Sequence, residues 1–314
     1  MKHKISFIVP TMDREKDLYR MLKSLEAQSV LPDQVIIVDG SYNKVNHMID
    51  KFPLLKIEYV RVFPPSLSKQ KNAGVKKVSN DSTLVGYLDD DLEFYKDSVE
   101  NMLSFWDKAS DKYGGAAFSV TNIDRKVGSI RKFFKIDSDS PGKVFSNGFV
   151  SMLDNPGRTT DVDWLYGGAT VWKREVIGKY EYDEWYQGSG FMEDIDFSYN
   201  IREKYNLIVL AEARVQHHTH PIRGDRYYLL GKWQIINRLY FVGKYIDRGL
   251  SVSDAWKASF SVILVNLLAG IARLNYNRIR MAAGNIVGLI IALIKKDAQI
   301  VGHLKRINKK KEGL

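Results

Sequence analysis

The sequence predicts an α/β fold built on a mixed, mostly parallel sheet that is flanked by helices. Short apolar runs alternate with helical patterns through the first half of the chain, as expected for strands joined by helical crossovers. Polar and acidic residues follow several of these runs directly. Right-handed crossovers bring the carboxyl ends of parallel strands to one edge, where open α/β sheets bind ligands. We therefore expect a ligand site at that edge.

Four apolar runs predict the first strands, and one clear helix lies between the first two. The runs are residues 5–9, 35–38, 57–60 and 84–88. Apolar residues at three- and four-residue steps predict a helix around residues 18–25, with Thr11 or Asp13 as its cap. A segment from about 119 to 163, rich in Ser, Asp, Asn and Gly, predicts loops and short strands that fold over a site.

Length and composition exclude several classes of protein. With 314 residues, of which 45% are hydrophobic, the chain has enough apolar material for one large core or two smaller ones, so disorder is not expected. The absence of cysteine excludes disulfides, thiolate metal sites and a cysteine nucleophile, and it fits a reducing compartment. The amino terminus carries no pattern typical of an export signal, so we expect a cytoplasmic protein.

The sharpest motif is the acidic triplet Asp89, Asp90 and Asp91, which directly follows an apolar strand. Like charges this close repel one another unless a cation lies among them. A divalent ion held by carboxylates and by a diphosphate resolves this repulsion for a nucleotide substrate. The alternative is a solvated acidic loop that caps the next helix. The position of the triplet at the strand end, beside Asp39 and Asp13, favours the metal.

Three further patterns point toward the same edge. Residues 68–74 predict a helix start that brings Lys71 and Asn72 close to phosphate or base, although lysines on a helix are usually solvated. Glu193 and Asp194 open another predicted helix behind the flexible Gly167 and Gly168, where a carboxylate can act as a general base or simply complement the helix dipole. Histidines 217, 218 and 220 follow a strand-like run, and a metal or phosphate role for them is as well supported as a structural one.

Together these motifs resemble the family-two inverting glycosyltransferases of the GT-A fold. The opening Phe7-Ile8-Val9-Pro10-Thr11 and the later Val38-Asp39-Gly40-Ser41 resemble the nucleotide-binding start of that family. Lys71-Asn72-Ala73-Gly74 is similar to its Arg-Asn-x-Gly element, with lysine in place of arginine. Asp89-Asp90-Asp91 matches its Asp-x-Asp motif, and Glu193-Asp194-x-Asp196 matches its Glu-Asp motif. The resemblance covers about residues 4–220.

The resemblance implies a role for each matching residue. The residues that the resemblance implies in binding the nucleotide are Pro10, Thr11, Asp39, Lys71, Asn72 and Asp89. Asp13 and Asp90, at the same edge, are expected to bind it as well. Asp91 and His217 would bind Mn²⁺ or Mg²⁺ under the diphosphate of a UDP-, GDP- or dTDP-sugar, with His218 as the competing histidine. The flexible Gly167 and Gly168, together with Glu193, are expected to contact a glycan or lipid-linked acceptor. Asp194 would be the catalytic base of a hexosyltransferase-like, inverting reaction in cell-surface polysaccharide synthesis.

The last third of the chain has a different character. Residues 258–271 and 281–294 are strongly apolar but shorter than the roughly 20 residues needed to span a bilayer. Residues 295–311 are strongly basic, and the whole chain carries a formal charge of +10. We expect a catalytic domain at 1–222, with a nucleotide-sugar half to about 118 and an acceptor half after it. A helical, basic region at 223–314 would then dock on an anionic membrane surface or form a homo-oligomer.

Other classes of function explain the sequence less well. A dinucleotide-dependent oxidoreductase requires Gly-x-Gly-x-x-Gly after the first strand, where this chain has Pro10-Thr11-Met12-Asp13. A sugar nucleotidyltransferase requires a glycine-rich, arginine-bearing loop that the sequence lacks. A basic nucleic-acid-binding or membrane-binding protein without catalysis fits the charge and the aromatic residues after position 226. An acidic ligand edge would repel a phosphate backbone, so we expect no nucleic-acid partner.

Overall fold

The structure is a computed structural model that describes residues 2–123, 127–153, 155, 157–186, 188, 190–222, 224 and 226–294. The chain forms two compact units. Unit 1 comprises residues 1–125 and 153–219, and unit 2 comprises residues 126–152 and 220–314. This division differs from the expected boundary at 222 because residues 126–152, from the expected acceptor half, group with the carboxyl-terminal region.

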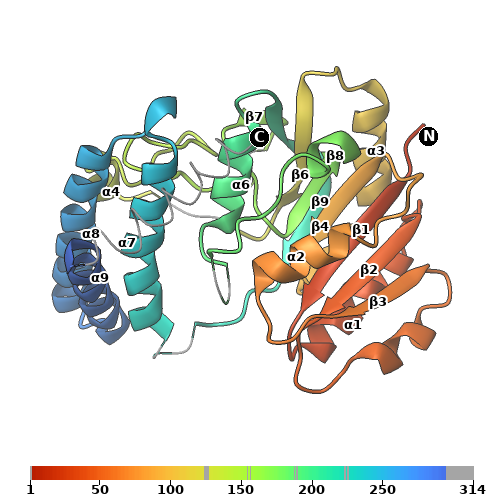
Figure 1. Ribbon diagram of the computed structural model, residues 1–314, viewed down its shortest axis with the longest axis horizontal. Coiled ribbons are helices and arrows are strands. Elements are labelled where there is room, and N and C mark those ends of the chain that lie inside the picture. The colour runs from red at the N-terminus through yellow and green to blue at the C-terminus, as the bar shows by residue number, and fades with distance from the viewer. Residues whose placement is uncertain are drawn as a thin grey trace, which may run out of the picture. The chain divides into compact units, whose positions relative to one another are not determined.

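The first half of unit 1 forms the parallel strands that the sequence predicts. These strands are β1 (Ile5–Thr11), β2 (Gln34–Asp39), β3 (Ile57–Arg61) and β4 (Leu84–Leu88). They pair in parallel in the order β3-β2-β1-β4 (Figure 1). The residues of β1, β2 and β4 are almost all buried, as is typical of a parallel sheet that is covered on both faces, whereas those of β3 at the end of the sheet are half-buried. All four strands therefore end at the same edge.

The sheet is mixed, as the sequence predicts, because its second half combines antiparallel and parallel pairs whereas β1–β4 are all parallel. The strands of the second half are β5 (Leu92–Phe94), β6 (Tyr113–Val120), β7 (Thr160–Val162), β8 (Ala169–Lys173) and β9 (Asn206–His217). β8 runs antiparallel to both β4 and β6, whereas β6 and β9 are parallel. Two reversals restore the original direction, so β9 ends at the same edge as β4.

Helices cover both faces of the sheet. On one face, α1 (Glu15–Glu26) and α3 (Ser98–Lys108) bury their apolar stripes in the main core. On the other face lie α2 (Leu67–Val75) and α6 (Glu193–Ile201). α2 meets the sheet at Gly74, where a Cβ would lie 2.4 Å from Ile8, and Phe197 of α6 packs on Trp172. The shorter helices are η1 (Asn46–Lys51) and α5 (Arg174–Ile177).

The predicted cap of the first helix is wrong. Arg14 occupies the N-cap position of α1, and no side chain caps the helix there. The Thr11 hydroxyl donates to Asp90 instead, and Asp13 accepts a hydrogen bond from the amide of Tyr42. Both residues are thus engaged by the loops of the ligand edge, which the local sequence pattern does not reveal.

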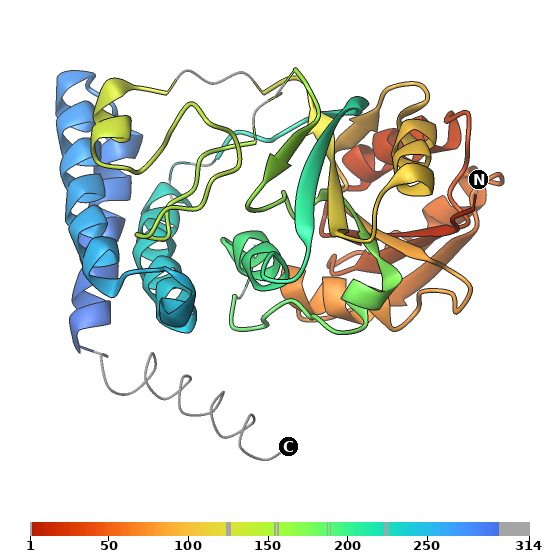
Figure 2. The ribbon, with the colours of Figure 1, turned by 90° about the horizontal axis from the view of Figure 1, so that it is seen from above.

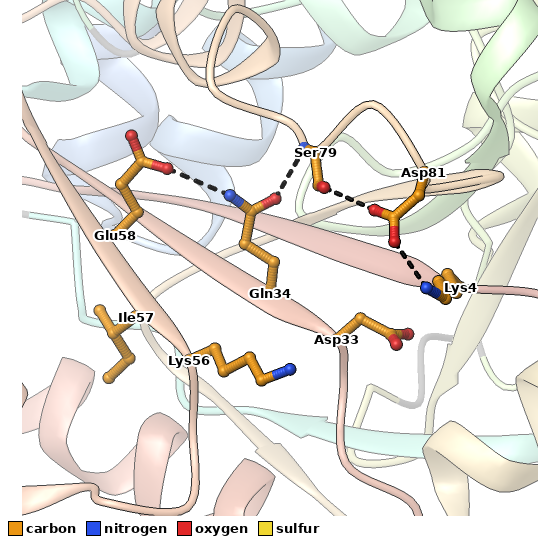
Figure 3. A pocket seen from close by; sticks show the side chains of 8 residues that line it. All are labelled: Lys4, Asp33, Gln34, Lys56, Ile57, Glu58, Ser79 and Asp81. Atoms are coloured by element: carbon orange, nitrogen blue, oxygen red, sulfur yellow. Dashed lines mark hydrogen bonds and ion pairs between the residues drawn. The ribbon is translucent and has the colours of Figure 1, made fainter.

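The opposite edge of the sheet, where β1–β4 begin, carries a hollow of about 400 Å³ (Figure 3). Its lining side chains are mostly polar, and most of them pair with one another. Gln34, for example, bonds Glu58, and Ser79 and Lys4 both bond Asp81. This hollow lies at the edge away from the acidic triplet.

The described part of unit 2 contains helices, connecting loops and one isolated bridge between Val144 and Val150. Its helices are α4 (Ser129–Phe133), α7 (Arg226–Lys244), η2 (Ile246–Arg248), α8 (Val252–Ala272) and α9 (Tyr276–Ile294). α8 and α9 run side by side, and α9 also packs along α7 (Figure 2).

The two carboxyl-terminal helices, of 21 and 19 residues, are longer than the apolar runs that predicted them. By length and composition alone both helices are long and apolar enough to cross a membrane, although their uncharged stretches, at residues 258–272 and 281–294, are about as short as the sequence indicated. The predicted basic tail at 295–311 lies outside the described residues.

Candidate active site

The predicted ligand edge brings together residues from both halves of the sheet. Asp39 ends β2, and Asp89 directly follows β4. His217 ends β9, which reaches this edge through the two strand reversals. Gly168 directly precedes β8, and its carbonyl accepts a hydrogen bond from the Asp89 amide at 2.7 Å. Four chain segments thus meet within unit 1.

Asp89, Asp91 and His217 form a compact candidate metal centre. One ligand atom from each of them lies within 4.8 Å of the other two. His217 Nε2 lies 2.8 Å from Asp91 Oδ1 and 3.8 Å from Asp89 Oδ2. Asp91 Oδ1 is buried, and no residue that the structure describes is aligned to donate a hydrogen bond to it. A buried carboxylate oxygen of this kind, beside a second carboxylate and an imidazole, fits a divalent cation such as Mn²⁺ or Mg²⁺.

Asp91 and His217 shift each other's pKa within the cluster. Burial by itself raises the pKa of Asp91, but His217 and Arg14 outweigh this effect and hold the pKa below its ordinary value. Burial by itself lowers the pKa of His217, but Asp91 and Asp89 outweigh it and raise the pKa. Arg14 NH1 lies 3.0 Å from Asp91 Oδ2. Positive groups of the chain itself thus neutralise the carboxylates, and a bound cation would compete with them.

Asp90, in the middle of the triplet, faces a different environment. Its side chain is buried, and its Oδ2 accepts a hydrogen bond from the Thr11 hydroxyl at 2.7 Å. Arg14 donates to the other carboxylate oxygen. Burial raises the pKa of Asp90 to about 7, although Arg14 and Thr11 oppose this shift. Asp90 therefore ties the end of β1 to the triplet and is not part of the candidate metal centre.

Asp39, which the resemblance assigns to the nucleoside, is fully buried and bound by its own chain. Its carboxylate accepts hydrogen bonds from the amides of Ser41 and Val45 and from the Tyr59 hydroxyl, and Arg61 lies 3.1 Å away. Burial by itself raises the pKa of Asp39, but these donors outweigh it and lower the pKa. Asp39 thus shapes the loop after β2. Pro10 and Thr11 lie beside it in the sheet, because they pair with Val38 and Asp39.

Asp194, the predicted base, lies in the first turn of α6, next to Gly167. Its carboxylate accepts hydrogen bonds from the amides of Ile195, at 2.9 Å, and of Gly167, at 3.3 Å. Burial raises its pKa, while the ammonium of Lys71 opposes this rise. Gly167 thus contacts Asp194 while its neighbour Gly168 contacts Asp89, so the candidate base and the candidate metal centre lie next to each other.

Gly168 is required for space. A Cβ at this position would lie 1.9 Å from Cγ of Asp89, and a Cβ at Gly167 would lie 2.5 Å from Nζ of Lys71. The sequence predicted that these glycines contact the acceptor. In the structure both make room for site side chains, so any contact with an acceptor would come from the backbone.

Lys71 and Glu193 form a buried ion pair directly behind Asp194. Lys71 Nζ lies 3.0 Å from Glu193 Oε1 and 4.4 Å from the centre of the Tyr182 ring. Burial raises the pKa of Glu193, while Lys71 opposes the rise. The sequence placed Lys71 beside the nucleoside and Glu193 beside the acceptor. Because both side chains are buried and bound to each other, the structure instead gives them a supporting place under Asp194.

Asn72 forms hydrogen bonds within the protein, and His217 is the histidine that lies in the candidate metal centre. The Asn72 amide bonds the backbone of Tyr182 in both directions, which fixes the loop before α6. His218 bonds Glu93, whereas His217 points to the candidate metal centre. Sequence reasoning missed Asp89 as a candidate metal ligand and missed Arg14 altogether. The position of Arg14 directly after Asp13 at the strand end was the available signal.

Comparison with known families agrees with this geometry. The model of the glycosyl transferase family 2 matches residues 6–159, which include β1–β4 and the acidic triplet. The chain carries a family 2 glycosyltransferase domain. It is similar to the uncharacterized glycosyltransferase YwdF of Bacillus subtilis (strain 168), with 28% identity over 149 residues. That match covers 46% of this chain and 54% of YwdF, so it spans about half the length of the relative.

Solved structures show that the glycosyltransferase domain has the GT-A fold. The mannosyltransferase PcManGT from Pyrobaculum calidifontis, in complex with GDP-Man and Mn²⁺, has a TM-score of 0.58 and 16% identity, over 95% of this chain and 89% of that one. S. aureus TarS 1-349 in complex with UDP has a TM-score of 0.50 and 14% identity, over 92% and 90%. GalNAc-T7 with UDP, GalNAc and Mn²⁺ has a TM-score of 0.53 and 16% identity, over 80% and 52%.

Proposed function

We propose that this protein is an inverting, metal-dependent glycosyltransferase that moves a sugar from a nucleoside-diphosphate sugar to a hydroxyl acceptor. The observation that carries the proposal is the contact of two consecutive glycines with two functional groups. Gly167 bonds Asp194, and Gly168 bonds Asp89 of the candidate metal centre. A group able to accept a proton thus lies beside a site able to hold a cation and a diphosphate.

Each residue has a defined task in this mechanism. Asp89, Asp91 and His217 would hold Mn²⁺ or Mg²⁺, which when bound stabilises the negative charge of the departing diphosphate. Asp194 accepts the proton of the acceptor hydroxyl as its oxygen attacks the anomeric carbon. The bond to the diphosphate breaks in the same displacement, so the anomeric configuration inverts. The raised pKa of Asp194 suits proton transfer from a hydroxyl, because a more basic carboxylate is a better base.

The nucleoside would bind at the ends of β1 and β2. Pro10, Thr11 and Asp13 line this end of the sheet together with Asp39. The Asp13 amide donates a hydrogen bond to the Ser41 hydroxyl at 2.8 Å, which joins the loops after the two strands. We propose a UDP-, GDP- or dTDP-sugar as donor and a glycan or lipid-linked acceptor in cell-surface polysaccharide synthesis in the cytoplasm. The nucleotide-sugar and nucleotide complexes of PcManGT and TarS support the class of donor.

A panel of UDP-, GDP- and dTDP-sugars tests the proposal. The purified chain is incubated with each donor and with Mn²⁺ or Mg²⁺, and the released nucleotide and the thermal unfolding temperature are measured. We expect one nucleoside diphosphate to be released, and the same donor to stabilise the protein only in the presence of metal. Formation of nucleoside triphosphate and sugar 1-phosphate when pyrophosphate is added would instead identify a sugar nucleotidyltransferase. Full turnover in excess chelator would disprove metal dependence.

A further inference from the structure

The packing of α8 and α9 in unit 2 is inverted relative to that of a water-exposed bundle. A helix that packs in a water-soluble core buries its large apolar side chains and exposes its polar ones. In α8 and α9 the buried positions hold mostly small or polar residues, with Val262 and Leu289 as the larger apolar exceptions, and most exposed positions in the middle of each helix hold large apolar side chains. The buried residues are Ala255, Ala258, Ser259, Val262, Asn266 and Gly270 on α8, and Ala282, Gly284, Asn285, Gly288, Leu289 and Ala292 on α9.

Glycines bring α7 and α9 into backbone contact. A Cβ at Gly231 of α7 would lie 2.1 Å from the carbonyl oxygen of Met281. A Cβ at Gly284 of α9 would lie 2.0 Å from the carbonyl oxygen of Tyr228, and one at Gly288 would lie 2.7 Å from that of Lys232. No larger side chain fits between these two helices at these points. Small residues that permit such close approach are typical of helix interfaces within lipid.

Buried amides join the three helices. Asn266 of α8 donates to Asn285 of α9 at 3.0 Å, and Asn285 donates to the Gly231 carbonyl of α7 at 2.8 Å. Arg278 donates a hydrogen bond to Oδ1 of Asn266 and so extends this series of hydrogen bonds. Asn266 is 1% exposed and Asn285 is 0% exposed. Polar groups are therefore satisfied in the interior, as is required where the surroundings offer no hydrogen bonds.

The outer surface of the same helices is apolar and uncharged. The exposed large side chains are Phe260, Leu264, Leu268 and Ile271 on α8 and Ile286, Ile290, Leu293 and Ile294 on α9. We name this set the outer apolar face. Residues 258–272 and 281–294 contain no charged residue. Leu264 and Leu268, at 48% and 57% exposed, would lose the free energy of apolar burial if this face met only water.

Positive charges flank the outer apolar face at the ends of its uncharged stretches. Lys257 precedes the stretch on α8 and Arg273 follows it, while Arg278 and Arg280 precede the stretch on α9. In the sequence Lys295 and Lys296 follow directly. Basic residues at the border of an apolar surface are attracted to anionic headgroups. This distribution of charge favours a lipid surface over a second copy of the same basic chain, which would repel it.

We infer that the outer apolar face of α8 and α9 is immersed in the lipid of an anionic membrane. The uncharged stretches rise by roughly 22 Å and roughly 21 Å at 1.5 Å per residue. Both are shorter than the roughly 30 Å of a hydrocarbon core. The helix pair therefore lies within one side of the bilayer, with its basic ends among the headgroups. This inference rests on the packing of unit 2 and does not depend on the proposed activity.

Vesicle flotation tests this assignment. The full chain is mixed with vesicles of phosphatidylcholine and phosphatidylglycerol, and the variant Leu264→Glu/Leu268→Glu is compared with the control Leu54→Glu/Ile130→Glu. Both variants add the same charge at exposed apolar positions, but only the first changes the outer apolar face. We expect the wild type and the control to float, and the partition coefficient of the first variant to fall at least about tenfold. Unchanged circular dichroism shows that each variant is folded.

A second measurement avoids any change of charge. Because the chain contains no cysteine, a single introduced cysteine takes up a polarity-sensitive fluorophore at one place only. We expect the emission of labelled Leu268→Cys to shift to the blue when vesicles are added, and that of labelled Ile130→Cys to stay unchanged. Equal flotation of both glutamate variants would overturn the inference. So would a wild type that stays unbound and runs as a dimer which Leu264→Glu/Leu268→Glu converts to a monomer.

Discussion

The ammonium of Lys71 lies 3.0 Å from Oε1 of Glu193, and both side chains are at least nine-tenths buried. The two residues come from α2 and α6, and the pair lies under Asp194. Breaking a buried ion pair on one side leaves the other charge without compensation in a medium that solvates it poorly.

Removal of one partner should therefore destabilise the protein. We expect Lys71→Met to lower the free energy of unfolding by about 3–5 kcal/mol, measured by urea denaturation. The loss should grow as the pH rises above about 8, because burial raises the pKa of Glu193 to about 8 and only the ionised carboxylate is left without compensation. The double variant Lys71→Met/Glu193→Gln should recover part of the loss. Strictly additive effects of the two single variants would show that the pair is not coupled.

Asp91 and Asp90 should respond differently to the same substitution. Asp91→Asn removes a ligand of the candidate metal centre, whereas Asp90→Asn changes a neighbour that is bound to Thr11 and Arg14. Substitution of a residue that only supports a metal ligand typically lowers metal affinity by about 10- to 100-fold. Because Asp91 is itself a candidate ligand, we expect Asp91→Asn to lower the affinity for Mn²⁺ by at least about 100-fold. Calorimetric titration with Mn²⁺ in the presence of nucleoside diphosphate measures this loss. Equal losses in both variants would remove the distinction between the two carboxylates.

Substitution of Asp194 should lower turnover and leave donor binding intact. We expect Asp194→Asn to lower kcat by about 10²- to 10⁴-fold, with nucleotide affinity nearly unchanged, because a base acts on the acceptor. The pKa of Asp194 is raised, so the loss of activity of the wild type in acid should begin above pH of about 4. Steady-state kinetics across pH check both points. Lost donor binding in Asp194→Asn would assign the residue a structural or metal-binding role.

Gly168 should not tolerate even a methyl group. The added Cβ of Gly168→Ala would lie 1.9 Å from Cγ of Asp89, so this carboxylate must move away from the candidate metal centre. We expect Mn²⁺ affinity to fall by about tenfold or more, as it does for a displaced supporting group. Gly178→Ala is the matched control, because the nearest atom would be 3.6 Å away. An unchanged Mn²⁺ affinity in Gly168→Ala would mean that Asp89 is not a ligand.

Because of Asp39, the free energy of unfolding should depend on pH in acid solution. Its pKa is lower in the folded state than in the unfolded state, so its contribution to stability is fully present above the unfolded value of about 3.9 and is lost as the pH falls through the folded value. We expect Asp39→Asn to cost about 1–3 kcal/mol near neutral pH, with the difference from wild type narrowing below pH of about 4. Urea denaturation at a series of pH values measures this, with the exposed Asp50→Asn as control. A difference that is constant with pH would contradict this origin.

Much of the first half of unit 1 could be predicted from local patterns. Strand β4 has the predicted bounds, and α1 buries the four apolar residues whose spacing predicted it. The reason is physical: the period of a strand or helix is a property of neighbouring residues, and burial of one face follows from it. The gathering of Thr11, Asp39 and Asp89 at one edge follows in turn from parallel pairing.

The packing of α8 and α9 shows a property of the fold that local sequence patterns do not determine. Periodicity predicted an apolar stripe on each helix, but it did not tell whether that stripe faces a core or the surroundings. The buried bond between Asn266 and Asn285 and the close contact at Gly284 turn the stripes outward. These contacts depend on which helix lies beside which, and a stripe seen on one helix alone does not contain that information.

The sequence by itself determined the class of the fold, the acidic edge and the residue types of the site. Only the tertiary structure decided that His217, and not His218, meets Asp91, that Asp89 joins them, and that Lys71 binds Glu193. Lys71 and Glu193 are 122 positions apart, and their contact arises from the strand reversals and helix packing that lie between them. Local residue patterns carry the preferences of single elements, whereas burial and charge pairing are properties of elements brought together from distant parts of the chain.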